Sequence, residues 1–383
     1  MAHSIDTHAK RIIINTVPVQ LSLTGVGHYV NQLVRHFNLM DERNEYTYFY
    51  GFYTKQFFGP THGIHRIRNQ LGKAPWLRRS IRQALFFFSG LLQSQFDLYF
   101  EPNFIPVKIK AGKIVTTVHD FSFRLFPEAH PKDRIQYFEK NFSKNIRRSD
   151  RIITDSLYIK NEAVEFLGLP SDMITPVHLG VDHEVFKVYG KESLALCKRE
   201  FGLPEKFMLF VGTREPRKNL DRLIRAYAEL PEQVQGEFSL VLVGPRGWGE
   251  SDPSARKNLG NRVRVLDYVE TQKLALVYNL ASVFVYPSLY EGFGLPPLEA
   301  MACGCPVIAS RAASLPEVCG DAAYYVDPAD VDSITEGLYK VLNDDGLRRT
   351  LIEKGKQRAK LFTWEKTARE TLEVFDEVLG RTR

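Results

Sequence analysis

The stretch Ser288-Leu-Tyr-Glu-Gly-Phe-Gly-Leu-Pro-Pro-Leu-Glu-Ala-Met-Ala302 decides the fold of the second half of the chain. A strand is expected directly before it, and its two prolines favour the first turn of a helix. Glu291 therefore falls in a strand-to-helix loop, and Glu299 lies in the helix that follows. Gly292 and Gly294 let the backbone approach a ligand and point its N–H groups at an anion. The alternative is a glycine-rich turn with two solvated glutamates.

Short apolar runs alternate with helical patterns on both sides of this stretch. In the second half the expected strands are 207–211, 238–243, 263–266, 283–286, 307–309 and 323–326. In the first half the expected strands are 11–16, 46–52, 97–100, 114–118 and 152–154, with helices from after Gly27 to about Met40, at 132–148 and at 157–167. Near-continuous apolar strands separated by helices are typical of buried parallel sheets. The pattern therefore predicts an α/β protein with two Rossmann-like, doubly wound domains that face a cleft.

The length and composition agree with this division. A chain of 383 residues is too long for one compact core of usual size. Its 44% hydrophobic and 25% charged residues exclude disordered, collagen-like and disulfide-scaffold proteins. We place the boundary between Asp182 and Glu205, which gives a first domain of residues 1–186 and a second of residues 187–362.

The cysteines and the apolar runs bear on the cellular setting. Cys197, Cys303, Cys305 and Cys319 show no metal-site spacing, and so few cysteines favour a reduced, cytosolic setting. The first ten residues are polar, so no secretory signal is expected. The most apolar run, 84–92, is about half the length of a bilayer span, so no membrane crossing is expected either.

The net charge of +6 is unevenly distributed. Residues 1–186 hold 23 Lys and Arg against 17 Asp and Glu, whereas residues 187–383 hold 28 of each. No acidic residue lies between Glu45 and Asp97. This excess indicates that the first domain meets an anionic partner. Nucleic acid is not expected to be that partner, because no DNA- or RNA-binding motif accompanies the charge.

A second constellation lies at Phe210-Val-Gly-Thr-Arg-Glu-Pro-Arg-Lys-Asn-Leu220. Gly212 ends a strand, and the cations Arg214, Arg217 and Lys218 stand just before a helix. Two cations and a helix N-terminus at this place would neutralise a leaving diphosphate. The alternative is a set of surface basic residues at a helix start.

Two motifs of the first domain complete the set. His119, in Thr117-Val-His-Asp-Phe121, follows a predicted strand and is expected to face the cleft, although a histidine there can be purely structural. Gly25-Val-Gly27 opens the first helix. As a dinucleotide fingerprint this turn is incomplete, because position 30 is Val rather than Gly or Ala. It can serve ligand binding or only a tight turn.

Taken together, these motifs resemble family 4 of the retaining glycosyltransferases. The likeness is strongest in Glu-Gly-Phe-Gly-Leu-Pro-x-Leu-Glu-Ala-Met-Ala, with its two glutamates, and it extends over nearly the entire chain. The resemblance implies the GT-B fold, a nucleotide-sugar substrate, and no metal or other cofactor. It also implies that a C-terminal helix, within 363–383, crosses back to the first domain.

The resemblance assigns roles to particular residues. Arg214 and Lys218 would bind the donor diphosphate, with Arg217 as the less usual choice of arginine. His119 and Glu291 would contact the donor sugar, and Glu299 the ribose; the role of Asp120 stays open. The donor-binding residues implied are Gly25, Gly27, Gly212, Gly244, Tyr268, Val269, Gly292, Phe293, Gly294, Leu295 and Glu299. Attack would occur on the face that the diphosphate leaves, with retention of configuration.

A closer resemblance concerns the substrate. Residues 119–131 and 212–219 look most like bacterial mannosyltransferases of O-antigen assembly. This likeness implies GDP-mannose as donor and a polyprenyl-diphosphate-linked glycan as acceptor, at the cytoplasmic face of the membrane. UDP-glucose or another nucleotide hexose is the alternative. Two other classes are a non-catalytic nucleotide-sugar-binding module and a Rossmann oxidoreductase, both disfavoured by the motifs above.

The segment Trp76–Leu92 is expected to be a basic amphipathic helix. Apolar residues recur there at helical spacing, with Arg78, Arg79 and Arg82 on other faces. Such a helix fits an anionic membrane surface near a lipid-linked acceptor. Packing into the core with a solvated basic face is the alternative. We therefore expect a cytoplasmic protein with peripheral membrane contact; the sequence leaves its oligomeric state open.

Overall fold

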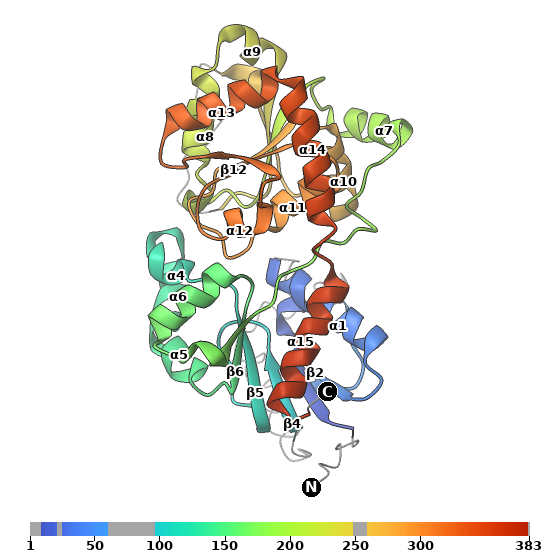
Figure 1. Ribbon diagram of the computed structural model, residues 1–383, viewed down its shortest axis with the longest axis vertical. Helices are drawn as coiled ribbons and strands as arrows, with labels where there is room; N and C mark the ends of the chain where they lie inside the picture. Colours follow the sequence, from blue (N-terminus) through green and yellow to red (C-terminus); the bar gives the residue numbers. More distant parts are fainter. Residues whose placement is uncertain (1–8, 21–24, 60–95, 248–258, 382–383) are drawn as a thin grey trace, which may run out of the picture.

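The computed structural model describes residues 9–20, 25–59, 96–247 and 259–381, which form two domains (Figure 1). The sheet of the first domain has the strand order β3-β2-β1-β4-β5-β6-β7. Its strands are β1 (Arg11–Asn15), β2 (Glu45–Phe49), β3 (Tyr53–Thr54), β4 (Phe96–Glu101), β5 (Ala111–Val118), β6 (Arg151–Thr154) and β7 (Ile174–Pro176). The helices that follow them are α1 (Gly25–Met40), α4 (Ser122–Leu125), α5 (Lys132–Ile146) and α6 (Leu157–Leu167).

The second domain repeats this plan with the strand order β10-β9-β8-β11-β12-β13. Its strands are β8 (Phe207–Val211), β9 (Ser239–Val243), β10 (Val263–Leu266), β11 (Val283–Tyr286), β12 (Val307–Ser310) and β13 (Ala323–Val326). Its helices are α7 (Lys191–Phe201), α8 (Leu220–Glu229), α9 (Glu232–Glu237), α10 (Thr271–Leu280), α11 (Leu295–Ala302), α12 (Leu315–Cys319), α13 (Val331–Asn343) and α14 (Asp345–Ala359). The prediction of two Rossmann-like domains is thus confirmed.

The strands are apolar along their length because both faces of each sheet are covered. In β1, Ile12 and Ile14 pack into the cluster formed with α1, whereas Ile13 packs into a separate cluster. All residues of β8 and β11 are buried. The predicted strand over 46–52 is wrong in its extent. The chain turns at Gly51, where φ is +92°, and β3 pairs back antiparallel to β2.

The chain crosses between the domains twice, and the two crossings lie side by side. Val181 and Thr363 form a parallel bridge, and a Cβ added at Gly180 would lie 2.1 Å from the backbone nitrogen of Trp364. After the second crossing, α15 (Trp364–Val378) packs against α1 in the first domain (Figure 1). Its Phe375 ring lies 5.1 Å from Phe100, centroid to centroid. The first domain is therefore built from both ends of the described chain.

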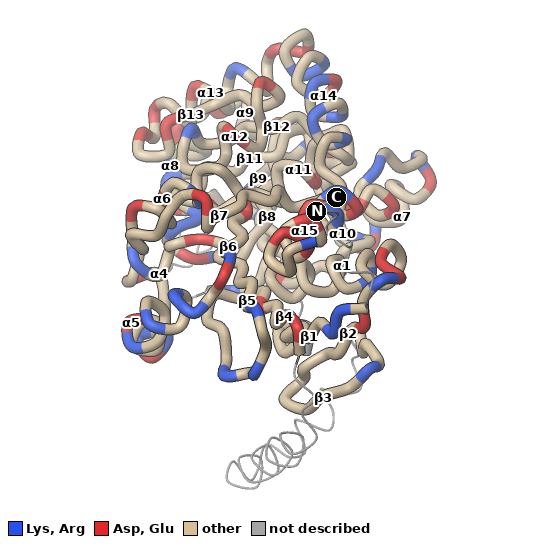
Figure 2. The backbone as a smooth tube through the Cα atoms, turned by 60° about the horizontal axis from the view of Figure 1, so that its bottom comes forward, with Lys and Arg blue, Asp and Glu red and all other residues tan. Residues whose placement is uncertain are grey.

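The described part of the first domain does not carry the charge excess. Lys and Arg alternate with Asp and Glu over both domains (Figure 2). Residues 60–95 of the acid-free stretch, which include Arg78, Arg79 and Arg82, lie outside the described residues. Among the described residues, no helix is both long and apolar enough to cross a membrane.

Candidate active site

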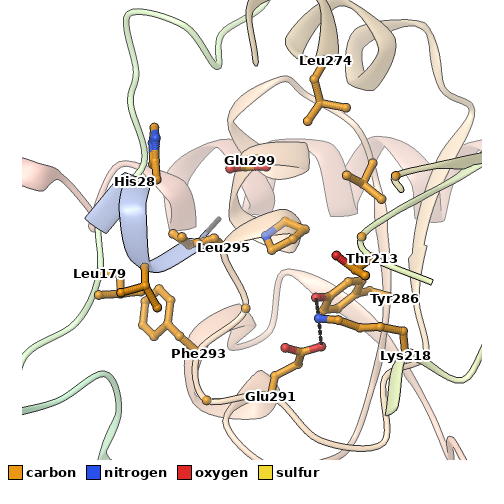
Figure 3. A pocket seen from close by; sticks show the side chains of 18 of the residues that line it. His28, Leu179, Thr213, Lys218, Leu274, Tyr286, Glu291, Phe293, Leu295 and Glu299 are labelled. Atoms are coloured by element: carbon orange, nitrogen blue, oxygen red, sulfur yellow. Dashed lines mark hydrogen bonds and ion pairs between the residues drawn. The ribbon is translucent and has the colours of Figure 1, made fainter. Parts of the chain in front are cut away.

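A cavity of about 420 Å³ lies between the two domains. The second domain lines it with the carboxyl ends of β8, β9 and β11 and the start of α11. The first domain adds the start of α1 and the loop after β5. Carboxyl ends of parallel strands are where doubly wound sheets bind ligands. The close view in Figure 3 shows Lys218 and Glu291 together on one side of this cavity and Phe293 and Leu179 on another.

A buried ion pair occupies the wall formed by the second domain. The Lys218 ammonium donates to Glu291 Oε1 at 2.6 Å and to the Tyr286 hydroxyl at 2.8 Å (Figure 3). Lys218 ends a short 3-10 turn, Pro216–Lys218, after which Asn219 takes a left-handed conformation with φ of +62°. The Asn219 amide donates to the Pro287 carbonyl at 2.9 Å and so holds this turn beside the loop that carries Glu291.

Arg217 holds Glu291 from the other side. Its guanidinium donates to Glu291 Oε2 at 3.0 Å and to Glu215 Oε1 at 2.6 Å. Burial alone would raise the pKa of Glu291, but Arg217 and Lys218 outweigh burial and lower the pKa to about 2. Burial also lowers the pKa of Lys218, against the opposing effect of Glu291. The site thus presents an ionised carboxylate held by two cationic side chains.

Glycines allow the close backbone approaches around this ion pair. A Cβ added at Gly244 would lie 2.1 Å from the Gly212 carbonyl oxygen, so the ends of β8 and β9 touch through their backbones. A Cβ added at Gly292 would lie 2.0 Å from the carbonyl oxygen of His119 in the first domain. Gly294, with φ of +116°, then turns the chain into α11. These positions require glycine because of their space or their backbone angles.

The His119 ring is held by the first domain. Its Nδ1 lies 2.8 Å from Asp155 Oδ2, and its Nε2 lies 2.9 Å from the Pro102 carbonyl oxygen. A carbonyl only accepts, so Nε2 carries a proton. Burial would lower the pKa of His119, but the Asp155 carboxylate outweighs it and raises that pKa. Both nitrogens are engaged, so only the ring carbons and the backbone of His119 can face the cavity.

Glu299 lies on α11, across the cavity from His28 (Figure 3). Its Oε2 accepts from the Tyr278 hydroxyl at 3.1 Å. Burial raises the pKa of Glu299 to about 7, and the hydrogen bond from Tyr278 opposes that rise. This carboxylate has no cationic partner among the contacts of the described chain, so it is available to accept hydrogen bonds from ligand hydroxyls.

Comparison with known proteins identifies the chain. The profile of "Glycosyl transferases group 1" matches residues 198–358, and that of "Glycosyltransferase Family 4" matches residues 23–185. The O-antigen chain mannosyltransferase B of Escherichia coli is 34% identical over 95% of this chain and 99% of its own length. The chain belongs to glycosyltransferase family 4.

Solved structures support the GT-B fold of this glycosyltransferase. Sucrose-phosphate synthase of Thermosynechococcus elongatus superposes with a TM-score of 0.70 at 20% identity, covering 97% of this chain and 100% of its own. The Anabaena protein HepE, in complex with UDP-glucose, superposes with a TM-score of 0.69 at 16% identity, covering 96% and 100%. The predicted fold class is confirmed.

The structure brings together most residues that the sequence selected for the glycosyltransferase site. All predicted catalytic and donor-binding residues line the cavity except Gly27 and Arg214. Gly27 is buried inside α1. The Arg214 guanidinium lies 3.4 Å from Asp267, outside the cavity lining, and its predicted role at the diphosphate stays a prediction. The backbone of Arg214 pairs with the loop after β9.

Sequence reasoning missed several residues of the site. The cavity lining also includes His28, Tyr29, Asp155, Thr213 and Tyr286. His28 and Thr213 stand next to predicted glycines, which was an available signal. Asp155 gave no signal, because it is 36 positions from the histidine that it binds.

Among residues 9–20, 25–59, 96–247 and 259–381, no group of three or more His, Cys, Asp or Glu is placed to hold a metal ion. Cys303 and Cys305 are buried free thiols in the core of the second domain.

Proposed function

We propose that this glycosyltransferase moves mannose from GDP-mannose onto a polyprenyl-diphosphate-linked glycan in O-antigen assembly. The observation that carries the choice of sugar is the nearly full-length likeness to an O-antigen chain mannosyltransferase. The choice of donor site rests on the Lys218–Glu291 ion pair, which is buried in the wall of a cavity that both domains line.

The cavity suggests how the donor lies. The diphosphate would sit between Lys218 and the first backbone N–H groups of α11, where the helix N-terminus also favours negative charge. The hydroxyls of ribose would donate to Glu299. The sugar would then lie beside Glu291 and the His119 backbone. HepE binds UDP-glucose on the same fold, which supports a nucleotide sugar in this place.

The proposed reaction proceeds with retention and without a metal. The bond between the anomeric carbon and the diphosphate breaks, and the acceptor hydroxyl attacks from the same face. The acceptor proton passes to the leaving diphosphate. Lys218 stabilises the negative charge that develops on that group, and Glu291 fixes the sugar through its hydroxyls.

Thermal shift with a panel of donors tests the choice of substrate. We expect GDP-mannose to raise the melting temperature more than UDP-glucose or other UDP-hexoses. A larger shift with UDP-glucose would contradict the proposal and favour a family 4 transferase for glucose. Binding without transfer to any lipid-linked acceptor would instead indicate a non-catalytic binding module.

Two further assays test metal independence and membrane contact. We expect full transfer in EDTA, and complete loss would contradict the metal-free mechanism. We also expect the full chain to float with liposomes that contain anionic lipid. Changing Arg78, Arg79 and Arg82 together to Ala should weaken that flotation, and unchanged flotation would refute the proposed cytoplasmic-face contact.

A further inference from the structure

Helix α6 of the first domain makes direct hydrogen bonds to the second domain. Its N-cap residue, Ser156, donates through Oγ to the Gly292 carbonyl at 2.8 Å. The backbone N–H groups of Leu157 and Tyr158 donate to the two carboxylate oxygens of Glu317 at 2.8 and 3.0 Å. A carboxylate of one domain thus caps a helix of the other, which ties the first turn of α6 to the second domain.

Tyr290 extends these contacts into the body of the first domain. It belongs to the second domain by sequence, yet its side chain is only 3% exposed and packs in the hydrophobic cluster of α5 and α6. Its hydroxyl donates to Glu162 Oε2 on α6 at 2.5 Å. The same hydroxyl accepts from the backbone N–H of Phe121 at 2.9 Å. Both of these hydrogen bonds therefore cross the domain interface.

The backbone of Tyr290 is fixed as firmly as its side chain. Its carbonyl oxygen accepts from Arg217 Nη1 at 2.6 Å, and the same nitrogen donates to Glu291 Oε2 at 3.0 Å. Glu291 is the next residue along the chain. The peptide unit between Tyr290 and Glu291 is therefore held in two ways. Arg217 binds its carbonyl oxygen, and α6 binds the Tyr290 side chain.

We propose that Tyr290 is a positioning residue, which places Glu291 against the donor sugar only while its hydroxyl is bound to Glu162 of the first domain. This inference rests on the proposed function, in which Glu291 fixes the sugar. In that proposed function the nucleotide would contact the second domain through Lys218 and Glu299. Loss of the Tyr290 hydroxyl should therefore impair the chemical step and leave nucleotide binding intact.

The test is Tyr290→Phe in the full chain, measured by transfer kinetics and by calorimetric binding of GDP. We expect kcat to fall about tenfold, with the Kd for GDP changed less than about threefold. Tyr325→Phe is the matched control, because that hydroxyl donates at 2.6 Å to Gly320 within the second domain. The control should keep the wild-type kcat. A Tyr290→Phe variant with wild-type kcat, or one whose loss lies in the Kd for GDP, would overturn the proposal.

Glu162 supplies a second, independent test. Glu162→Leu should lower kcat as much as Tyr290→Phe, and Glu162→Gln should restore most of it because its side-chain oxygen still accepts. The double variant Tyr290→Phe/Glu162→Leu should lose no more than either single variant. Additive losses would overturn the proposal, even if Tyr290→Phe alone folded poorly.

Glu291→Gln separates this inference from the proposed function. If that variant transfers sugar at the wild-type rate, the role of Glu291 is wrong, and the proposed donor site fails with it. If Glu291→Gln is inactive while Tyr290→Phe and Glu162→Leu are fully active, only the positioning role of Tyr290 fails.

Discussion

Glu299→Gln should make the protein more stable at pH 8 and weaker in binding nucleotide. Glu299 lines the cavity on α11 and accepts one hydrogen bond, from Tyr278. Burial raises its pKa from 4.5 to about 7. The folded protein therefore binds this proton more tightly than the unfolded chain does. Stability must then fall as the pH rises from about 4.5 to 7, where the folded group ionises.

The size of the effect follows from this pKa. The rise corresponds to about 3 kcal/mol once the carboxylate is fully ionised, at 1.36 kcal/mol for each pKa unit. The cavity is open to water, which offsets part of the cost, so we expect about 2 kcal/mol at pH 8. Glutamine has no such cost, so the variant should gain this amount at pH 8 and almost nothing at pH 4.5.

Urea unfolding followed by tryptophan fluorescence at pH 5 and pH 8 measures this difference. Glu336→Gln, an exposed change on α13, is the matched control and should leave stability unchanged at both values. The affinity of Glu299→Gln for GDP should fall about tenfold, because a hydrogen bond to a charged acceptor is lost. A stability difference equal at both pH values, or a less stable variant at pH 8, would refute the reasoning.

Three further changes test other parts of the site. Lys218→Met should lower the rate of sugar transfer, measured as turnover of the donor, by at least about 100-fold. It should also lower the melting temperature, because buried Glu291 loses one of its two cations. Gly292→Ala should abolish transfer but keep GDP binding by calorimetry, because its Cβ would strike the His119 carbonyl and hold the domains apart. Glu317→Gln should cost about 1 kcal/mol at pH 7 in urea unfolding, because the charged cap of α6 is lost. Burial would raise the pKa of Glu317, but its hydrogen bonds from His178, Leu157 and Tyr158 outweigh burial and hold that pKa below 4.5. The cost should therefore shrink as the pH falls from 4.5 and disappear below the lowered pKa.

Much of the fold could be predicted because its signals are local. Buried parallel strands are apolar along their length, so several, such as 283–286, begin and end as predicted. The strand-to-helix loop with Glu291 was also predictable, since glycines and prolines mark its turns. Each of these features depends on residues close together in the chain.

Side-chain direction and contacts between domains were not predictable in the same way. Arg214 and Arg217 are three positions apart, and either could have faced the cavity. Neither of them lines it, because Arg214 turns to Asp267 and Arg217 to Glu291, partners that lie 53 and 74 positions away in the chain. The hydrogen bond of Tyr290 to Glu162 joins residues 128 positions apart, and the hydrophobic periodicity of a sequence does not predict contacts over such a separation.

The return of α15 to the first domain has a consequence for synthesis on the ribosome. Phe375 packs against Phe37 and Phe100, which leave the ribosome more than 270 residues earlier. Until α15 emerges, those rings lack the part of their cover that Phe375 gives, whereas the second domain is complete once α14 has been made. The domain that is translated first is therefore the last to finish folding. A nascent chain stalled before residue 364 would expose that apolar face to chaperones and proteases.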